Sequence, residues 1–185
     1  MKIVVVSDTH NSSGSIQKIG DISQNIRSDL VIHLGDFYDD LTPESLGDIP
    51  LIRVPGTWTS FYQNPLIDNR RVDVFQGWRF FLSHTPEKDS HDLIDDVDPQ
   101  AFIRGGNCDV FLHGHTHHFN LESVSFEKGS VLVCNPGHLS ESDSRTQRSY
   151  CILEVSLTTI IGTIMSLEDQ KILCTITYDK KPHSD

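Results

Sequence analysis

The chain has 185 residues, of which 37% are hydrophobic and 22% charged, a composition typical of folded globular proteins and not of disordered ones. This length is typical of a single domain that can bury a core, so we expect one domain over residues 1–185. The net charge of −11 argues against a general binder of the nucleic-acid backbone, because such proteins need a basic face.

Membrane and secretory classes are also disfavoured. No apolar run approaches the roughly 18 residues that a membrane span needs, and the run 3–6 is too short for the core of a signal peptide. The four cysteines are widely separated and form no Cys-x-x-Cys pair, which argues against a zinc ribbon or a redox site. We therefore expect a cytoplasmic protein whose thiols are reduced and mostly buried.

The first part of the chain alternates short apolar runs with polar loops, which predicts α/β layering. Strands are expected at 2–6, 29–34 and 51–54, since each run is aliphatic and a glycine-containing loop follows it. Ser13 and Ser15 are candidate caps for a helix of about 10 to 12 residues. A set of isoleucines gives this helix an apolar stripe, namely Ile16, Ile19, Ile22 and Ile26. A second, short helix should begin at Thr42-Pro43.

The rest of the chain reads mainly as strands. They are expected at 72–75, 78–82, 110–112, 119–126, 130–134, 149–156, 159–166 and 171–178. The acidic segment 88–100 is predicted to hold a helix, and another should open at Asp98 or Pro99. We interpret the carboxylates of this segment as a solvated face and not a site: Asp89, Asp92, Asp95, Asp96 and Asp98. The tail 180–185 is expected to be frayed.

Carboxylates and imidazoles follow directly after several of these strands. In extended backbone, side chains two positions apart point the same way, so His115 and His117 can converge on one point, as can Asp8 and His10. Neutral imidazole is the commonest metal-binding side chain. The full set of candidate metal ligands at strand ends is Asp8, His10, Asp36, His84, His115 and His117.

Two carboxylates and four imidazoles suffice for two divalent ions that each keep an open position. Asp36 could bridge ions about 3.5–4 Å apart, the spacing of two-metal phosphoesterases, which generate hydroxide at neutral pH and neutralise phosphoryl charge. The alternative is that six such residues end strands by accident. We interpret His33, inside an apolar run, as a core histidine or a support for a ligand. His138 is interpreted as a surface-turn residue, with reach into the site as the alternative.

The motif order resembles that of the calcineurin-like metallophosphoesterases, and in particular their small bacterial and archaeal phosphodiesterase branch. It comprises Ser7-Asp8-Thr9-His10, Gly35-Asp36, Ser83-His84, Gly114-His115-Thr116-His117 and the turn Asn135-Pro136-Gly137. This resemblance implies a four-layer α/β/β/α sandwich of two mixed β-sheets flanked by helices. It further implies that Asp8, His10 and His117 hold a first metal. Asp36 would bridge, and His84 and His115 would hold a second.

By the same resemblance, Asp36, His84 and His115 are the expected catalytic residues. Mn2+ is the expected metal, with Ni2+, Fe2+, Co2+ and Zn2+ as rivals. Several positions depart from the family pattern, among them Thr57, Trp58, Thr85-Pro86 and His138. Thr57 replaces an asparagine that would ligate the second metal, so that ion should be held more weakly or completed by water. Trp58 replaces a histidine near the leaving group, so general-acid help from that position is absent.

Two functions follow from this pattern. The first is a metal-dependent phosphodiesterase or phosphatase acting on a small phosphate ester. The alternative is a catalytically weak or inactive scaffold that mediates protein interaction, for which the retromer subunit of this superfamily is a precedent. Trp58, Phe61 and Tyr62 could stack on a nucleobase, or they could pack under a loop or at a subunit contact, and we favour packing. The oligomeric state, including a homo-oligomer, stays open.

Overall fold

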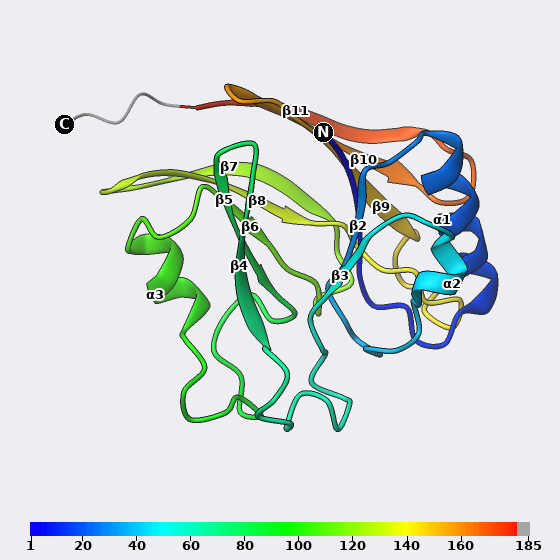
Figure 1. The fold of residues 1–185 in the computed structure, drawn as a ribbon, viewed down its shortest axis with the longest axis horizontal. Helices are drawn as coiled ribbons and strands as arrows, with labels where there is room; N and C mark the ends of the chain where they lie inside the picture. The colour runs from blue at the N-terminus through cyan, green and yellow to red at the C-terminus, as the bar shows by residue number, and fades with distance from the viewer. Residues whose placement is uncertain (181–185) are drawn as a thin grey trace.

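Two mixed β-sheets packed face to face form the centre of the protein in a computed structural model, which describes residues 1–180 (Figure 1). The first sheet has the order β11-β10-β9-β1-β2-β3 and the second β4-β5-β6-β8-β7. The strands of the first sheet are β1 (Lys2–Val6), β2 (Leu30–His33), β3 (Leu51–Arg53), β9 (Ser149–Val155), β10 (Thr159–Ser166) and β11 (Ile172–Asp179). Those of the second are β4 (Arg70–Phe75), β5 (Trp78–Ser83), β6 (Val110–Leu112), β7 (Asn120–Phe126) and β8 (Gly129–Asn135).

The alternation of side chains along β1 shows how the layers are separated. Ile3 and Val5 point into the core between the sheets, where they join Phe80 and Leu112 of the second sheet. Val4, between them in the sequence, points outward into a separate core under the helices. Both faces of β1 are therefore buried, and this is why its sequence is a continuous apolar run with no polar alternation.

Helices cover the outer faces of both sheets (Figure 1). α1 (Ser13–Asn25) and α2 (Pro43–Leu46) pack on the first sheet, and their Ile19 and Leu46 are buried in the outer core with Val4. α3 (Pro99–Arg104) packs on the second sheet through Ile103. The predicted four-layer α/β/β/α sandwich is confirmed, and within residues 1–180 no helix is long and apolar enough to cross a membrane.

The helix caps follow their local chemistry. Thr42 and Ser45 form a capping box with Pro43 at the first helical position, and Asp98 accepts a hydrogen bond from the Gln100 backbone N–H. The predicted cap of α1 is displaced, because Ser12 occupies the N-cap position and the helix starts at Ser13. The cysteine prediction holds in part: all four thiols are free, and Cys174 alone among them is half-buried while the others are buried.

The acidic segment before α3 was predicted wrongly. Residues 88–98 form turns and no helix, and Asp92 is no solvated carboxylate, since its side chain is 2% exposed and pairs with Arg70 at 2.8 Å. Asp96 joins this network through Arg70 Nη1 at 3.5 Å. The buried guanidinium supplies the partner that the sequence pattern did not reveal. The frayed-tail expectation for 180–185 is wrong for Lys180, whose backbone N–H donates to the Thr158 carbonyl at 2.8 Å, and residues 181–185 lie outside the described part of the chain.

Candidate metal centre

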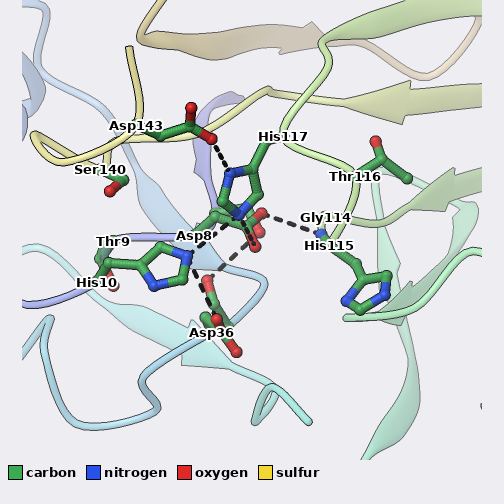
Figure 2. A network of polar contacts seen from close by, with 12 residues as sticks. Asp8, Thr9, His10, Asp36, Gly114, His115, Thr116, His117, Ser140 and Asp143 are labelled. Atoms are coloured by element: carbon green, nitrogen blue, oxygen red, sulfur yellow. Dashed lines mark hydrogen bonds and ion pairs between the residues drawn. The ribbon is translucent and has the colours of Figure 1, made fainter. Parts of the chain in front are cut away.

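The six predicted ligand residues lie in loops that follow parallel strands. β1 and β2 run parallel in the first sheet, as β5 and β6 do in the second. Asp8 and His10 follow β1, Asp36 follows β2, His84 follows β5, and His115 and His117 follow β6. Because the carboxyl ends of parallel strands lie at one edge of a sheet, and these edges of the two sheets lie together, the Asp8, His10, Asp36 and His117 side chains point toward one another (Figure 2).

The backbone at four of these positions adopts a conformation that is uncommon outside glycine. Four of the candidate ligands are non-glycine residues with left-handed φ angles, namely Asp8 at 53°, His10 at 46°, His115 at 69° and His117 at 62°. Such conformations are uncommon outside glycine and are held only where the surrounding structure enforces them. Left-handed turns at alternate residues place several side chains around one point, which a regular strand could not do.

A first group of ligand atoms comes from Asp8, His10 and His117, which all lie within 4.8 Å of one another. The His117 Nε2 atom is 3.4 Å from Asp8 Oδ1 and 3.1 Å from His10 Nε2. His10 Nε2 in turn lies 3.3 Å from Asp36 Oδ2, so Asp36 borders this group (Figure 2). Carboxylate oxygens and imidazole nitrogens that face one another at these distances leave room for a cation between them.

A second group is formed by Asp8, Asp36 and His84, also within 4.8 Å of one another. His84 donates its Nδ1–H to the Leu34 carbonyl at 2.7 Å, which leaves the Nε2 lone pair facing Asp36 Oδ1 at 3.7 Å. His115 Nδ1 lies 3.2 Å from the same His84 nitrogen. Asp8 belongs to both groups, and Asp36 of the second group lies 3.3 Å from His10 of the first, so both carboxylates lie between the two groups.

Close backbone packing fixes these carboxylates. The His115 backbone N–H donates to Asp8 Oδ2 at 3.0 Å, and the Gly56 backbone N–H donates to the Asp36 backbone carbonyl at 3.0 Å. Gly56 lies against Asp36 and Gly114 against Ser7, so closely that a Cβ on either glycine would collide with its neighbour. The glycines in these loops are therefore required by the approach of two loops to each other.

The electrostatics of the group depend on burial and on mutual contacts. Burial opposes the charged form of Asp8, but the His117 imidazole, 3.4 Å from Oδ1, and the nearby His84 bring the pKa of Asp8 down to about 2. Burial raises the pKa of Asp36, since His84 and His10 compensate only in part. The Asp8 carboxylate beside its ring raises the pKa of His117 to about 9, whereas burial lowers the pKa of His115.

Two unsatisfied oxygen atoms show what the site fits. Asp8 Oδ1 and Asp36 Oδ1 are buried and have no hydrogen-bond partner among residues 1–180. A buried carboxylate oxygen without a partner is costly unless a cation or an ordered water completes it. The surrounding donors are imidazole nitrogens and carboxylate oxygens, a set suited to divalent transition ions. The residues present therefore fit divalent metal ions.

Thr57 and Trp58 lie in the loop after β3, at the edge of the cluster. Thr57 is half-buried, and its side chain has no hydrogen bond to the six ligand candidates within the described residues. Trp58 is 79% exposed, so it does not pack under a loop, and a subunit contact for it stays a prediction. The packing interpretation is confirmed for Tyr62, which is fully buried and donates its hydroxyl to Asp92. Phe61 packs on Tyr38 with ring centroids 5.0 Å apart.

The structure adds one residue that the sequence did not point to, Asp143, and favours the alternative interpretation of His138. His138 is fully buried and stacks on His117 with ring centroids 5.2 Å apart and 18° between the rings, so its interpretation as a surface-turn residue is wrong. Asp143 lies 2.7 Å from His117 Nδ1, on the ring edge opposite Asp8 (Figure 2). His33 is confirmed as a core histidine, since it is fully buried and contacts the Thr9 hydroxyl.

Comparison with known proteins identifies the family. Residues 1–158 match the calcineurin-like phosphoesterase superfamily domain. The chain belongs to this superfamily. Phosphodiesterase MJ0936 from Methanocaldococcus jannaschii is 27% identical over 150 residues, which cover 74% of this chain and 83% of that protein. The resemblance drawn from the motif order is thereby confirmed.

Solved structures agree with the fold of this superfamily member. A conserved protein from Streptococcus pneumoniae TIGR4, described as a predicted phosphoesterase, has a TM-score of 0.68 at 20% identity, with 97% of each chain covered. Wild-type Vps29 from Entamoeba histolytica, solved in complex with zinc, has a TM-score of 0.64 at 20% identity, with 97% of this chain and 99% of that one covered. At this identity these likenesses concern the fold.

Proposed function

We propose that this chain, as a single domain over residues 1–185, is a metal-dependent phosphodiesterase or phosphatase that acts on a small phosphate ester. The observation that carries the proposal is the meeting of Asp8 Oδ1 and Asp36 Oδ1, both buried and without a hydrogen bond within residues 1–180, with the imidazoles of His10, His84 and His117 where the two sheets meet. Family membership and the similarity to a named phosphodiesterase support the same reaction class.

The roles of the residues follow from their contacts. Asp8, His10 and His117 would hold the first ion, His84 and His115 the second, and Asp36 would bridge them. Thr57, at the position assigned by the family resemblance, would complete the second site with a hydroxyl, a poorer ligand than an amide oxygen. Mn2+ is the proposed metal, and Ni2+, Fe2+, Co2+ and Zn2+ suit the same mixture of nitrogen and oxygen ligands.

When bound, two such ions would activate a water molecule and neutralise charge on the phosphoryl group. The protein's own part is to hold the ligands in place. His84 is oriented by the Leu34 carbonyl and is fully buried, and Asp8 is oriented by the backbone of His115. Asp36, His84 and His115 are the proposed catalytic residues. They would lie nearest the reacting phosphate, because Asp36 and His84 belong to the second group of ligand atoms and His115 adjoins His84. Trp58 projects outward from the loop beside Asp36 and offers no titratable group there.

The test is hydrolysis of bis-p-nitrophenyl phosphate by metal-stripped protein, with and without added Mn2+. We expect activity that requires the metal and is lost in Asp36→Asn, because the amide cannot bridge two cations as a carboxylate does. Asp21→Asn is the matched control, since Asp21 is an exposed carboxylate on α1. Bound metal should fall from two ions towards one or none in Asp36→Asn.

Two results would count against the proposal. Retention of both ions by Asp36→Asn would place the bridging role elsewhere. Absence of hydrolysis with Mn2+, Ni2+ and Co2+, by protein that binds metal, would favour the alternative of a scaffold that mediates protein interaction.

A further inference from the structure

The loop that follows β8 contacts the His117 ring on the side away from Asp8 and His10. His117 presents Nε2 to Asp8 and His10, at 3.4 and 3.1 Å. Its other nitrogen, Nδ1, is 2.7 Å from Asp143 Oδ2. The two ring nitrogens therefore face different partners, one in the metal centre and one in this loop (Figure 2).

We propose that Asp143 is a positioning residue for the first metal ion: it accepts a hydrogen bond from His117 Nδ1–H and so directs the Nε2 lone pair into the site. A neutral imidazole carries one proton, and the nitrogen that donates it cannot ligate a metal. A carboxylate behind a ligating histidine selects the tautomer, fixes the ring and raises the basicity of the free nitrogen. This inference rests on the proposed metal centre.

Asp143 is itself held in place. Its side chain is 8% exposed, and the Arg145 guanidinium donates to both of its oxygens, from Nε at 3.0 Å and from Nη2 at 2.8 Å. The Arg145 backbone N–H donates to the same carboxylate at 3.0 Å. These fixed donors hold the oxygens in the geometry that His117 needs.

The same loop makes two further contacts with His117, one with its backbone carbonyl and one with its ring. Thr146 donates its hydroxyl to the His117 carbonyl at 3.2 Å, so the backbone is tethered as well as the ring. His138 stacks on the His117 ring and lies 3.2 Å from the Thr146 carbonyl through its own Nε2. Hydrogen bond, stacking and tether together restrict rotation of the His117 ring about its side-chain bonds.

A third metal ion held by His117, His138 and Asp143 is the competing interpretation, because their ligand atoms lie within 4.8 Å of one another. The arrangement of charge disfavours it. Both oxygens of Asp143 already accept hydrogen bonds from a guanidinium, and a divalent cation there would lie next to that positive charge. Ligation through His117 Nδ1 would also remove the proton that leaves Nε2 free for the first site.

The experiment measures zinc affinity by competition with a chromogenic chelator. For Asp143→Ala we expect the tightest zinc site to weaken about 10- to 100-fold, the effect typical of losing such a partner. Asp143→Asn keeps a hydrogen-bond acceptor for Nδ1–H and should stay within a few-fold of the native protein. Asp21→Ala serves as the control for a carboxylate lost from an exposed position on α1.

The second readout is the tautomer of His117 in the zinc-loaded protein, observed by two-bond proton–nitrogen NMR correlations. We expect Nδ1 protonated and Nε2 bound to zinc in the native protein and in Asp143→Asn, with Asp143→Ala showing a mixture or loss of that pattern. A mere loss of folding would move the spectrum of the whole protein and not this pattern alone.

The outcomes separate this inference from the proposed function. Native protein that binds no divalent metal would overturn the metal centre itself, and with it the role of Asp143. Native protein that binds zinc, together with Asp143→Ala that binds it equally tightly with an unchanged tautomer, would overturn the positioning role alone. A third zinc ion lost specifically in Asp143→Ala would show that Asp143 is a ligand instead.

Discussion

At the scale of single residues, the proposed role of Thr57 as a poor ligand of the second metal ion can be tested by a substitution. We expect Thr57→Asn to tighten the second metal ion and raise phosphodiesterase turnover, because an amide oxygen reaches farther and is a better ligand than a hydroxyl. The affinity for the second ion can be followed by calorimetric titration of Mn2+ into metal-stripped protein. An unchanged second affinity would refute the role given to Thr57, and Thr59→Asn in the same loop is a control for local disturbance.

His33 carries a second consequence at this scale. It is fully buried, and burial, reinforced by Arg53 and His84 and opposed by Asp8, lowers its pKa from 6.5 to about 3. The folded protein then keeps His33 neutral below pH 6.5, where the unfolded chain binds a proton. The contribution to stability is therefore fully present above pH 6.5 and is lost as the pH falls towards 3.

The prediction concerns the slope of stability against pH. Between about pH 5.5 and 4, His33 should make the free energy of unfolding fall by about 1.4 kcal/mol per pH unit. His33→Gln has no group that titrates there, so its slope should be shallower by that amount. Urea unfolding in the presence of EDTA measures both without interference from metals. Parallel slopes would mean that His33 becomes protonated in the folded protein.

At the scale of elements, a buried ion pair joins two long loops. The buried Arg70 at the start of β4 donates to both oxygens of Asp92 at 2.8 Å, and both side chains are 2% exposed. Tyr62, from the loop before β4, donates its hydroxyl to the same carboxylate at 2.6 Å. One buried ion pair thus joins the loops after β3 and β5, which carry Trp58 and His84.

Breaking that pair from one side should be costly. Arg70→Met leaves the Asp92 carboxylate buried without its cation, and we expect a loss of about 3–5 kcal/mol in the free energy of unfolding. The neighbouring pair of Arg71 and Asp73 on β4 is more exposed, at 37% and 18%, so Arg71→Met should cost about 1 kcal/mol or less. Chemical denaturation measures both. Equal losses of unfolding free energy in the two variants would show that burial does not make the Arg70 pair costlier to break.

The same elements show how far the sequence could predict this protein. Strands such as 2–6 and 110–112 were predictable because short apolar runs that end in glycine-containing loops rarely form anything but buried strands. Ligand candidates such as Asp8 and His115 were then predictable as polar residues at the ends of those strands. The partner of Asp92 was not predictable, since Arg70 is 22 residues away in the sequence. Asp143 was missed because residues 140–148 are polar and without periodicity, so that only the path of the chain after β8 brings it to His117.

At the scale of the whole molecule, the candidate metal centre joins the two sheets. Asp8, His10 and Asp36 come from loops of the first sheet, whereas His84, His115 and His117 come from loops of the second. Between the sheets the apolar core excludes water, but at this edge two carboxylate oxygens are buried without partners. A chain with a net charge of −11 gains from cations at such a point, because they offset both local and overall repulsion.

Metal binding should therefore stabilise the fold as a whole and not one loop. A ligand at 100 times its dissociation constant adds about 2.7 kcal/mol, and for a chain of this size each kcal/mol raises Tm by about 2–4 °C. We expect Mn2+ to raise the Tm of metal-stripped protein by roughly 5–10 °C, as measured by calorimetry, and EDTA to reverse the shift. Asp36→Asn should show a smaller shift, because it retains fewer ions, whereas Asp21→Asn should respond as the native protein does. A Tm shift in Asp36→Asn equal to that of the native protein would mean that the stabilising ions bind elsewhere. No Tm shift at saturating metal would mean that metal ions do not stabilise the packing of the two sheets.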